Sequence, residues 1–148
     1  MSELSQAEGS MGFVELLKER SRVFHEYARE AFARGHYDLS VFNAEQALQL
    51  RLKALHLRMV GYVPRLHSVR ELLGVIVKIL EGLGRSDLAE KLSSFVETHR
   101  DSLRMLEEAY IASRYTPKTY EHDEAERALA TLEEAMSLID EVERLVFS

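Results

Sequence analysis

Apolar residues recur at steps of three and four along most of the chain, which is the spacing of one face of an α-helix. The pattern predicts five helical stretches, at about residues 13–35, 37–60, 68–82, from 86 to beyond 110, and 119–146. The second carries apolar residues on more than one face, which indicates a central helix packed on several sides. No segment alternates with a period of two between turn signals, so we predict no strands.

Glycine, proline and polar residues mark the ends of these stretches. Gly61 and Pro64 break the chain, and Ser68 with Glu71 has the form of a capping box that starts the third helix. Residues 98–101 have the same form, so the fourth stretch is expected to bend or restart there. These signals predict an all-α fold, an up-and-down four-helix bundle with an additional short or broken helix. We expect a flexible tail at 1–10 and a single helical domain at 11–148.

Length and composition narrow the class of protein. A chain of 148 residues suits one domain, and the absence of cysteine is compatible with a reducing cytosol. No run approaches the ~18 apolar residues of a membrane span, and the polar start does not resemble a signal peptide. We therefore expect a cytoplasmic protein without membrane contact. The formal net charge of −6 argues against a protein that coats nucleic acid through bulk electrostatics.

The charges are unevenly distributed. Between Glu45 and Glu71 there is no acidic residue, and this basic stretch contains five fixed positive charges, on Arg51, Lys53, Arg58, Arg65 and Arg70. The last thirty residues hold nine acids against two arginines. The basic stretch has two interpretations, a solvated helix face or a surface that docks a partner.

The sequence lacks the motifs that mark several kinds of catalytic or ligand-binding site. There is no glycine-rich phosphate loop after a strand and no HExxH motif. The six histidines are scattered, with no pair spaced to place two ligands on one helix face, so we expect neither a metal nor another cofactor. The many carboxylates do not single out an acid–base pair, because Asp and Glu on solvent faces are the default.

The stretch 109–122 joins a helix end to a helix start around Pro117 and holds several groups suited to phosphate chemistry. Four of them fall within nine residues: Arg114, Lys118, Tyr120 and His122. Arginine offers a planar fork of donors to a phosphodiester, histidine can transfer a proton near neutral pH, and tyrosine can stack on a base. Metal-free RNA cleavage needs such a proton-transfer group and a cation. The alternative is structural, with Arg114 at a helix C-terminus and His122 paired with nearby acids.

Separate pieces of the chain resemble the HEPN domain family (higher eukaryotes and prokaryotes nucleotide-binding), of the short archaeal and bacterial kind. The likeness covers about residues 13–147. It is carried by Gly35-His36-Tyr37, Asn43-Ala44-Glu45-Gln46-Ala47-Leu48, Lys53-Ala54, His67-Ser68 and Ala109-Tyr110-Ile111-Ala112-Ser113-Arg114-Tyr115.

The resemblance implies a homodimer. In many members an Arg-x4–6-His motif from each protomer meets at a cleft on the dimer axis and cleaves RNA without metal, whereas others only bind RNA or nucleotides. Short members are often paired with a minimal nucleotidyltransferase, in the manner of a toxin–antitoxin system. Here Arg114 matches the motif arginine, and His122 stands one residue beyond the permitted spacing, as Arg-x7-His.

We therefore predict Arg114 and His122 as the catalytic residues. The predicted contacts to RNA or nucleotide are Lys118, Tyr120, Tyr115 and Lys53. An alternative function is a catalytically inactive helical module that docks a partner protein through the basic stretch. A third hypothesis is a helical dimer without a small ligand.

Overall fold

The protein is all-helical in a computed structural model that describes the backbone of residues 3–115 and 118–148, and the side chains of 10–112 and 118–148. It contains the helices α1 (Glu3–Ala33), α2 (Tyr37–Val60), α3 (Val69–Gly82), α4 (Ser86–Thr98), α5 (Arg100–Tyr115) and α6 (His122–Val146). No strand occurs in these residues, so the predicted all-α class is confirmed. None of the described helices is long and apolar enough to cross a membrane.

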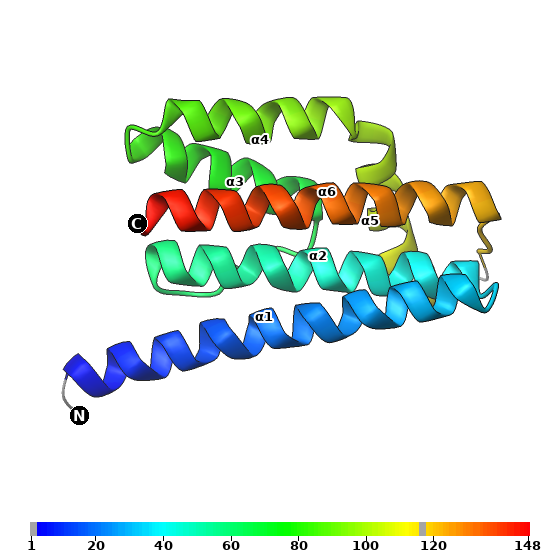
Figure 1. Cartoon of the computed structure of the whole chain (residues 1–148), viewed down its shortest axis with the longest axis horizontal. Coiled ribbons are helices and arrows are strands. Elements are labelled where there is room, and N and C mark those ends of the chain that lie inside the picture. The colour runs from blue at the N-terminus through cyan, green and yellow to red at the C-terminus, as the bar shows by residue number, and fades with distance from the viewer. Residues whose placement is uncertain (1–2, 116–117) are drawn as a thin grey trace.

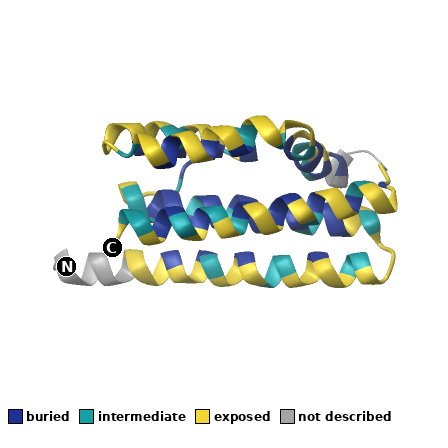
Figure 2. Ribbon diagram, turned by 45° about the horizontal axis from the view of Figure 1, so that its top comes forward, coloured by how far each residue is buried: buried dark blue, intermediate teal, exposed yellow. Residues whose placement is uncertain are grey.

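Helix α2 lies at the centre of the molecule. It contacts α1, α3, α5 and α6, and Figure 1 shows α1 and α6 alongside it, with α3 and α4 stacked beyond α6. Its apolar residues are buried on more than one face: Val41, Leu48 and Leu55 lie in the main core, whereas Ala54 and Leu57 pack against α1 in a second cluster. Figure 2 shows the same division, with buried residues on the inward sides of the helices and exposed ones outside. The sequence-based prediction of a central helix is confirmed.

The helix directions do not simply alternate. In Figure 1, α2, α3 and α6 run from right to left, whereas α1 and α4 run the other way. The reason is the segment 61–68, which folds back along α2: the Tyr62 carbonyl lies 2.9 Å from His56 Nδ1, and the His67 ring lies beside Lys53. Helix α3 therefore starts near the middle of α2. Apart from α3, the helices α1, α2, α4 and α6 alternate in direction in Figure 1, so the predicted up-and-down bundle with an additional helix stays a prediction that this view does not contradict.

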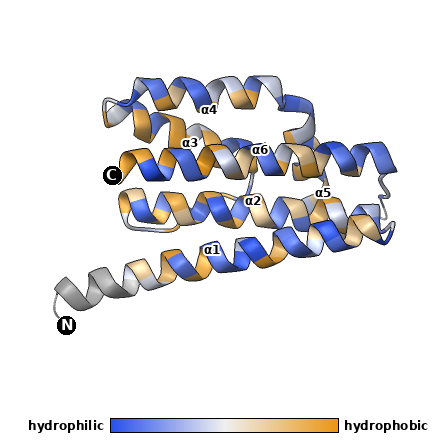
Figure 3. Cartoon of the chain, viewed as in Figure 1, coloured by the Kyte–Doolittle hydropathy of each residue, from blue (hydrophilic) through white to orange (hydrophobic). Residues whose placement is uncertain are grey.

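Serine side chains fasten α1 to α2. Ser21 Oγ donates to the Ala47 carbonyl at 2.6 Å, and Ser40 Oγ donates to the Ala28 carbonyl at 2.8 Å. The alanines at these positions let the two backbones approach closely. A smaller apolar cluster, Val14, Leu17, Ala54 and Leu57, joins the first half of α1 to the last half of α2. The start of α6 is hydrophilic in Figure 3, whereas α1 exposes several large apolar side chains, Met11, Phe13, Leu16 and Tyr27.

The helix ends test the predicted boundaries. The stretch from 86 is interrupted at His99, between α4 and α5, as the sequence suggested. Ser68 Oγ accepts from the Glu71 backbone N–H, as the capping signal predicted, and donates to the Glu107 carboxylate of α5.

Two boundaries differ from the sequence-based expectation. The expected tail at 1–10 is helical from Glu3 onward, since the residues that follow are mostly good helix formers. Helix α6 begins at His122 and not at about 119, because Glu121 and Glu124 form a capping box.

Candidate functional site

The catalytic residues predicted from the sequence belong to the turn between α5 and α6. The backbone of Arg114 lies in the last turn of α5. The side chains of Arg114 and Tyr115 lie outside the described residues, so their predicted roles remain predictions. The described part of the turn resumes at Lys118 and contains Tyr120 and His122.

His122 is the first residue of α6, and its ring is held against the α1–α2 connection. The imidazole centroid lies 5.0 Å from the ring of Phe32 and 5.5 Å from the ring of Tyr37, with an edge-on arrangement to Tyr37. Its Nδ1 is 3.2 Å from the Asp123 carboxylate, and half of the side chain remains exposed. The imidazole is therefore positioned by two aromatic rings and still open to solvent on one side, as a proton-transfer group requires.

The other two described residues of the turn differ in accessibility. Lys118 is exposed, and its ammonium group donates to Glu108 at 2.6 Å, which raises the pKa of the lysine. Tyr120 is 6% exposed, and none of the described residues bonds to its buried hydroxyl; burial raises its pKa. The prediction that Tyr120 contacts RNA is corrected: its ring is part of the core because it follows the turn inward against α5 and α6.

The predicted binding residue Lys53 belongs to a separate polar cluster between α2 and α5. Its ammonium group donates to Gln49 Oε1 at 2.9 Å and lies 3.2 Å from His67 Nδ1. Gln49 in turn donates to Glu45 at 2.7 Å, and Gln46 donates to the other oxygen of that carboxylate at 2.7 Å. The His67 ring stacks on Tyr110 of α5, with centroids 6.2 Å apart. We call these six residues the Lys53 cluster.

Burial changes the acid–base properties of the Lys53 cluster. Glu45 is completely buried, which raises its pKa to about 7 even though Gln49 and Gln46 donate to the carboxylate. Burial also lowers the pKa of Lys53, against the opposing effect of Glu45. Perturbed groups of this kind are more frequent at functional sites than elsewhere.

The Lys53 cluster and His122 lie at different places on the molecule. Tyr37, the contact of His122, and Lys53 are separated by sixteen residues of α2, or about 24 Å along the helix axis. The Lys53 cluster is closer to Arg114, because Tyr110 precedes Arg114 by one turn of α5, about 6 Å along the axis. The structure thus separates Lys53 from His122, which the sequence analysis had placed in one site.

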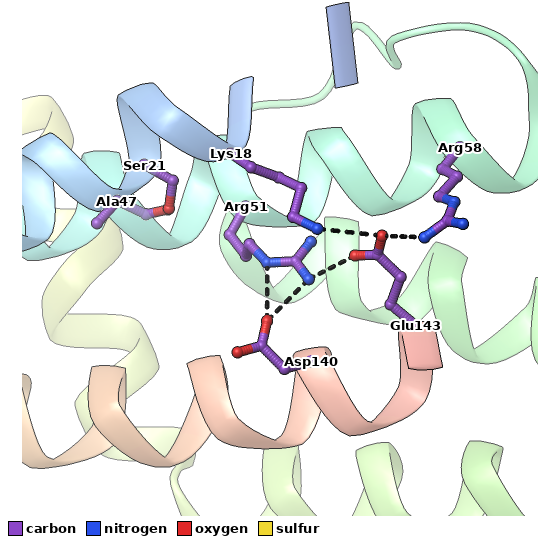
Figure 4. Close-up of polar contacts among 7 residues, drawn as sticks. All are labelled: Lys18, Ser21, Ala47, Arg51, Arg58, Asp140 and Glu143. Carbon is purple, nitrogen blue, oxygen red and sulfur yellow. Dashed lines mark hydrogen bonds and ion pairs between the residues drawn. The ribbon is translucent and has the colours of Figure 1, made fainter. Parts of the chain in front are cut away.

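The basic stretch of α2 is largely neutralised within the chain. Arg51 is buried and donates to Glu143 at 2.5 Å and to Asp140 at 2.9 Å. Figure 4 shows Lys18 and Arg58 reaching the same Glu143 carboxylate from α1 and α2. Burial would raise the pKa of Glu143, but its hydrogen bond from Arg58 and the charge of Arg51 outweigh this and lower it.

Among the described residues of this stretch, Arg51, Arg58 and Arg70 are paired with acids, whereas Arg65 is exposed. Arg58 also lies 4.0 Å above the Phe147 ring, and Arg70 donates to Glu107 at 2.7 Å. The alternative that Arg51 and Arg58 bind a partner protein stays a prediction; within the chain their charges are matched by acids of α6.

A surface hollow of about 300 Å³ among the described residues is lined partly by Lys18, Arg51 and Asp140. A groove of about 950 Å³ between α4 and α6 is lined mainly by polar and acidic side chains, with Phe95 and Leu138 among them. A smaller hollow of about 220 Å³, lined partly by Glu108 and Glu124, lies beside Lys118. No three His, Asp or Glu side chains of the described residues are arranged to share a metal ion.

Sequence reasoning did not select Glu45, Gln49 and His67 as site residues. A signal existed, since Glu45 is an acid within an apolar stretch, and both Glu45 and His67 belong to pieces that carry the family resemblance. What the sequence lacked was the direction of the segment 61–68, which brings His67 back beside α2.

The comparisons with known proteins give one result. The HEPN domain matches residues 14–142, a range that runs from α1 to the end of α6 and contains both the turn and the Lys53 cluster. No significant match was found among curated proteins or among solved structures. HEPN domains are ribonuclease-like and toxin-like modules. Because the match covers most of its length, the chain belongs to the HEPN domain family.

Proposed function

We propose that the protein is a homodimer that binds RNA and cleaves it without a metal ion, using the α5–α6 turns of two copies. The observation that supports this most is the HEPN match over residues 14–142, which contains Arg114 and His122 in that order. The half-exposed imidazole of His122, held by Phe32 and Tyr37, supplies a positioned proton-transfer group.

The proposed reaction is an internal transfer. The ribose 2′ oxygen attacks the neighbouring phosphorus, the bond to the 5′ oxygen breaks, and the products are a 2′,3′-cyclic phosphate and a 5′ hydroxyl. The His122 imidazole of one copy accepts the 2′ proton, and that of the second copy donates a proton to the leaving oxygen. The Arg114 guanidinium groups stabilise the negative charge that builds up on the phosphoryl oxygens.

Lys118 is proposed to add a phosphate contact beside this centre. Both side chains of the Lys118–Glu108 ion pair are exposed, and exposed ion pairs contribute little to stability in water. A phosphodiester can therefore take the place of the Glu108 carboxylate at little cost. Tyr115 remains a proposed base contact, and Tyr120 is omitted because its ring is buried.

Removing the proposed catalytic groups should abolish cleavage. We expect the purified protein to cleave end-labelled RNA in the presence of EDTA, and His122→Ala to lower the rate by about 10²–10⁴-fold, the usual contribution of a proton-transfer group. Arg114→Ala should lower it by a similar factor. His99→Ala is the matched control, since His99 pairs with Glu134 at the α4–α5 junction.

The product ends and the oligomeric state complete this test. Cyclic phosphate ends and a dimeric mass in light scattering are expected. Intact RNA with the wild-type protein, together with unchanged RNA binding and unchanged growth on expression of Arg114→Ala, would refute the assignment.

We also propose a minimal nucleotidyltransferase as the protein partner, on the strength of the resemblance to the short prokaryotic members. Protein isolated under native conditions is expected to carry such an enzyme in stoichiometric amount, identified by mass spectrometry. Isolation of the homodimer alone, at physiological salt and without crosslinking, would contradict this pairing.

A further inference from the structure

The hydrogen bonds of the Lys53 cluster run in one direction, from the buried acceptor Glu45 to the half-buried donor Lys53. Glu45 accepts from Gln49, and Gln49 Oε1 accepts from the Lys53 ammonium. An ammonium group can only donate, so the close nitrogen of His67, 3.2 Å away, is the acceptor. The same nitrogen lies 3.4 Å from Gln49 Oε1; in the tautomer that accepts from Lys53, the N–H of the ring is on Nε2.

This direction of the hydrogen bonds leaves N–H donors at the surface. Lys53 has three N–H groups, of which Gln49 and His67 take two among the described residues. His67 is exposed and contributes Nε2–H, while its ring is backed by Tyr110. The charged Lys53 ammonium and the His67 N–H therefore lie side by side at the surface. The buried Glu45 carboxylate orients them through Gln49.

The surrounding acids do not occupy these donors. Glu107 of α5 accepts from the Arg70 guanidinium, the Arg70 backbone and Ser68 at the start of α3. Its charge is thereby matched by Arg70 and not by Lys53. Glu45 is completely buried and accepts from Gln46 and Gln49, so it is linked to Lys53 through the Gln49 side chain.

We propose that Lys53 and His67, oriented by Glu45 and Gln49, form a phosphate-binding subsite for the RNA strand. The chemistry fits because a phosphodiester offers charged acceptor oxygens and no donor. The position fits because Tyr110, the neighbour of His67, lies one turn of α5 before Arg114. That the bound phosphate belongs to RNA rests on the proposed function; that the subsite binds a phosphate does not.

Binding of an uncleavable RNA tests the subsite. The probe is a fluorescein-labelled 2′-O-methyl oligouridylate, which lacks the attacking hydroxyl, followed by anisotropy over a range of salt concentrations. Lys53→Met, which keeps the aliphatic stem, is expected to weaken binding by about tenfold to a hundredfold and to reduce the salt slope by about one. His67→Asn should weaken binding by about tenfold. Lys78→Met, on the exposed side of α3, is the matched control.

A second measurement does not depend on RNA or on cleavage. Titration of the wild-type protein with inorganic phosphate, at constant neutral pH, should shift the imidazole nitrogen resonances of His67. Those of His25, which pairs with Glu133, should stay in place. Glu45→Gln should weaken both phosphate and RNA binding without touching either ligand, because the Gln49 amide then loses the carboxylate that fixes its orientation.

The outcomes separate this proposal from the proposed function. If RNA binds and Arg114→Ala weakens binding while Lys53→Met and His67→Asn do not, the subsite is overturned and the proposed function stands. If phosphate shifts His67 but the wild-type protein binds no RNA, the subsite stands and the proposed function fails. If phosphate leaves His67 unchanged and no RNA binds, both are overturned. Should Lys53→Met fail to fold, His67→Asn and the titration still decide.

Discussion

Glu143→Ala is expected to lower the free energy of unfolding by about 3–5 kcal/mol, the usual cost of removing one partner from a buried ion pair. Arg51 would keep only the exposed Asp140 as a counter-charge, and its guanidinium already has one nitrogen without a partner among the described residues. Lys18 and Arg58 would also lose their shared carboxylate. Against a total stability of about 5–15 kcal/mol, this is a large fraction. Urea unfolding followed by circular dichroism measures it.

Two further variants separate pairing from simple truncation. Glu141→Ala, two residues earlier on α6, removes an ion pair with the exposed Lys91 and should cost at most about 1 kcal/mol. The double variant Arg51→Met with Glu143→Leu replaces both buried charges by apolar groups and is expected to be near neutral. Equal losses for Glu143→Ala and Glu141→Ala would show that the buried pair does not hold α6 on α2.

The second large effect concerns the pH dependence of stability. The pKa of Glu45, about 7 in the folded protein against an ordinary 4.5, means that the folded state binds this proton more tightly than the unfolded chain. The resulting stabilisation is present in full below about pH 4.5 and is lost as the pH rises through 7. A shift of this size corresponds to about 3 kcal/mol. Between about pH 5 and 8, the wild-type protein should therefore lose up to ~3 kcal/mol more than Glu45→Gln.

The measurement is a set of unfolding curves for both proteins across this pH range. Glu71→Gln, at an exposed position in the first turn of α3, should follow the wild-type profile and serves as the control. Parallel profiles for wild type and Glu45→Gln would mean that the Glu45 carboxyl titrates in the folded protein as it does in water.

Local signals explain what could be predicted of the fold. The bounds of α2 and the interruption between α4 and α5 follow from apolar spacing, Gly61 and the polar residues at 98–101, all of which act within a few residues. The return of the segment 61–68 along α2 depends on contacts of His67 and Tyr62 with side chains of α2. Periodicity carries no information about such contacts, so the direction of α3 along α2 could not be predicted.

The residues of the candidate site were likewise predictable only in part. His122 was selected by residue type and lies, half-exposed, where a helix begins. Tyr120, also selected by type, is buried, because the turn after α5 directs that ring into the core. The basic and acidic stretches were both visible in the sequence, but their mutual pairing through Arg51 and Glu143 spans 92 positions and appears only in three dimensions.

That long separation has a consequence for synthesis of the chain. During translation Arg51, which will be enclosed in the folded protein, is added 92 residues before Glu143. Until then the guanidinium has no buried counter-charge, and sealing it against α1 would be costly. We therefore expect the nascent α1–α2 pair to stay open at this point until the residues of α6 have been added.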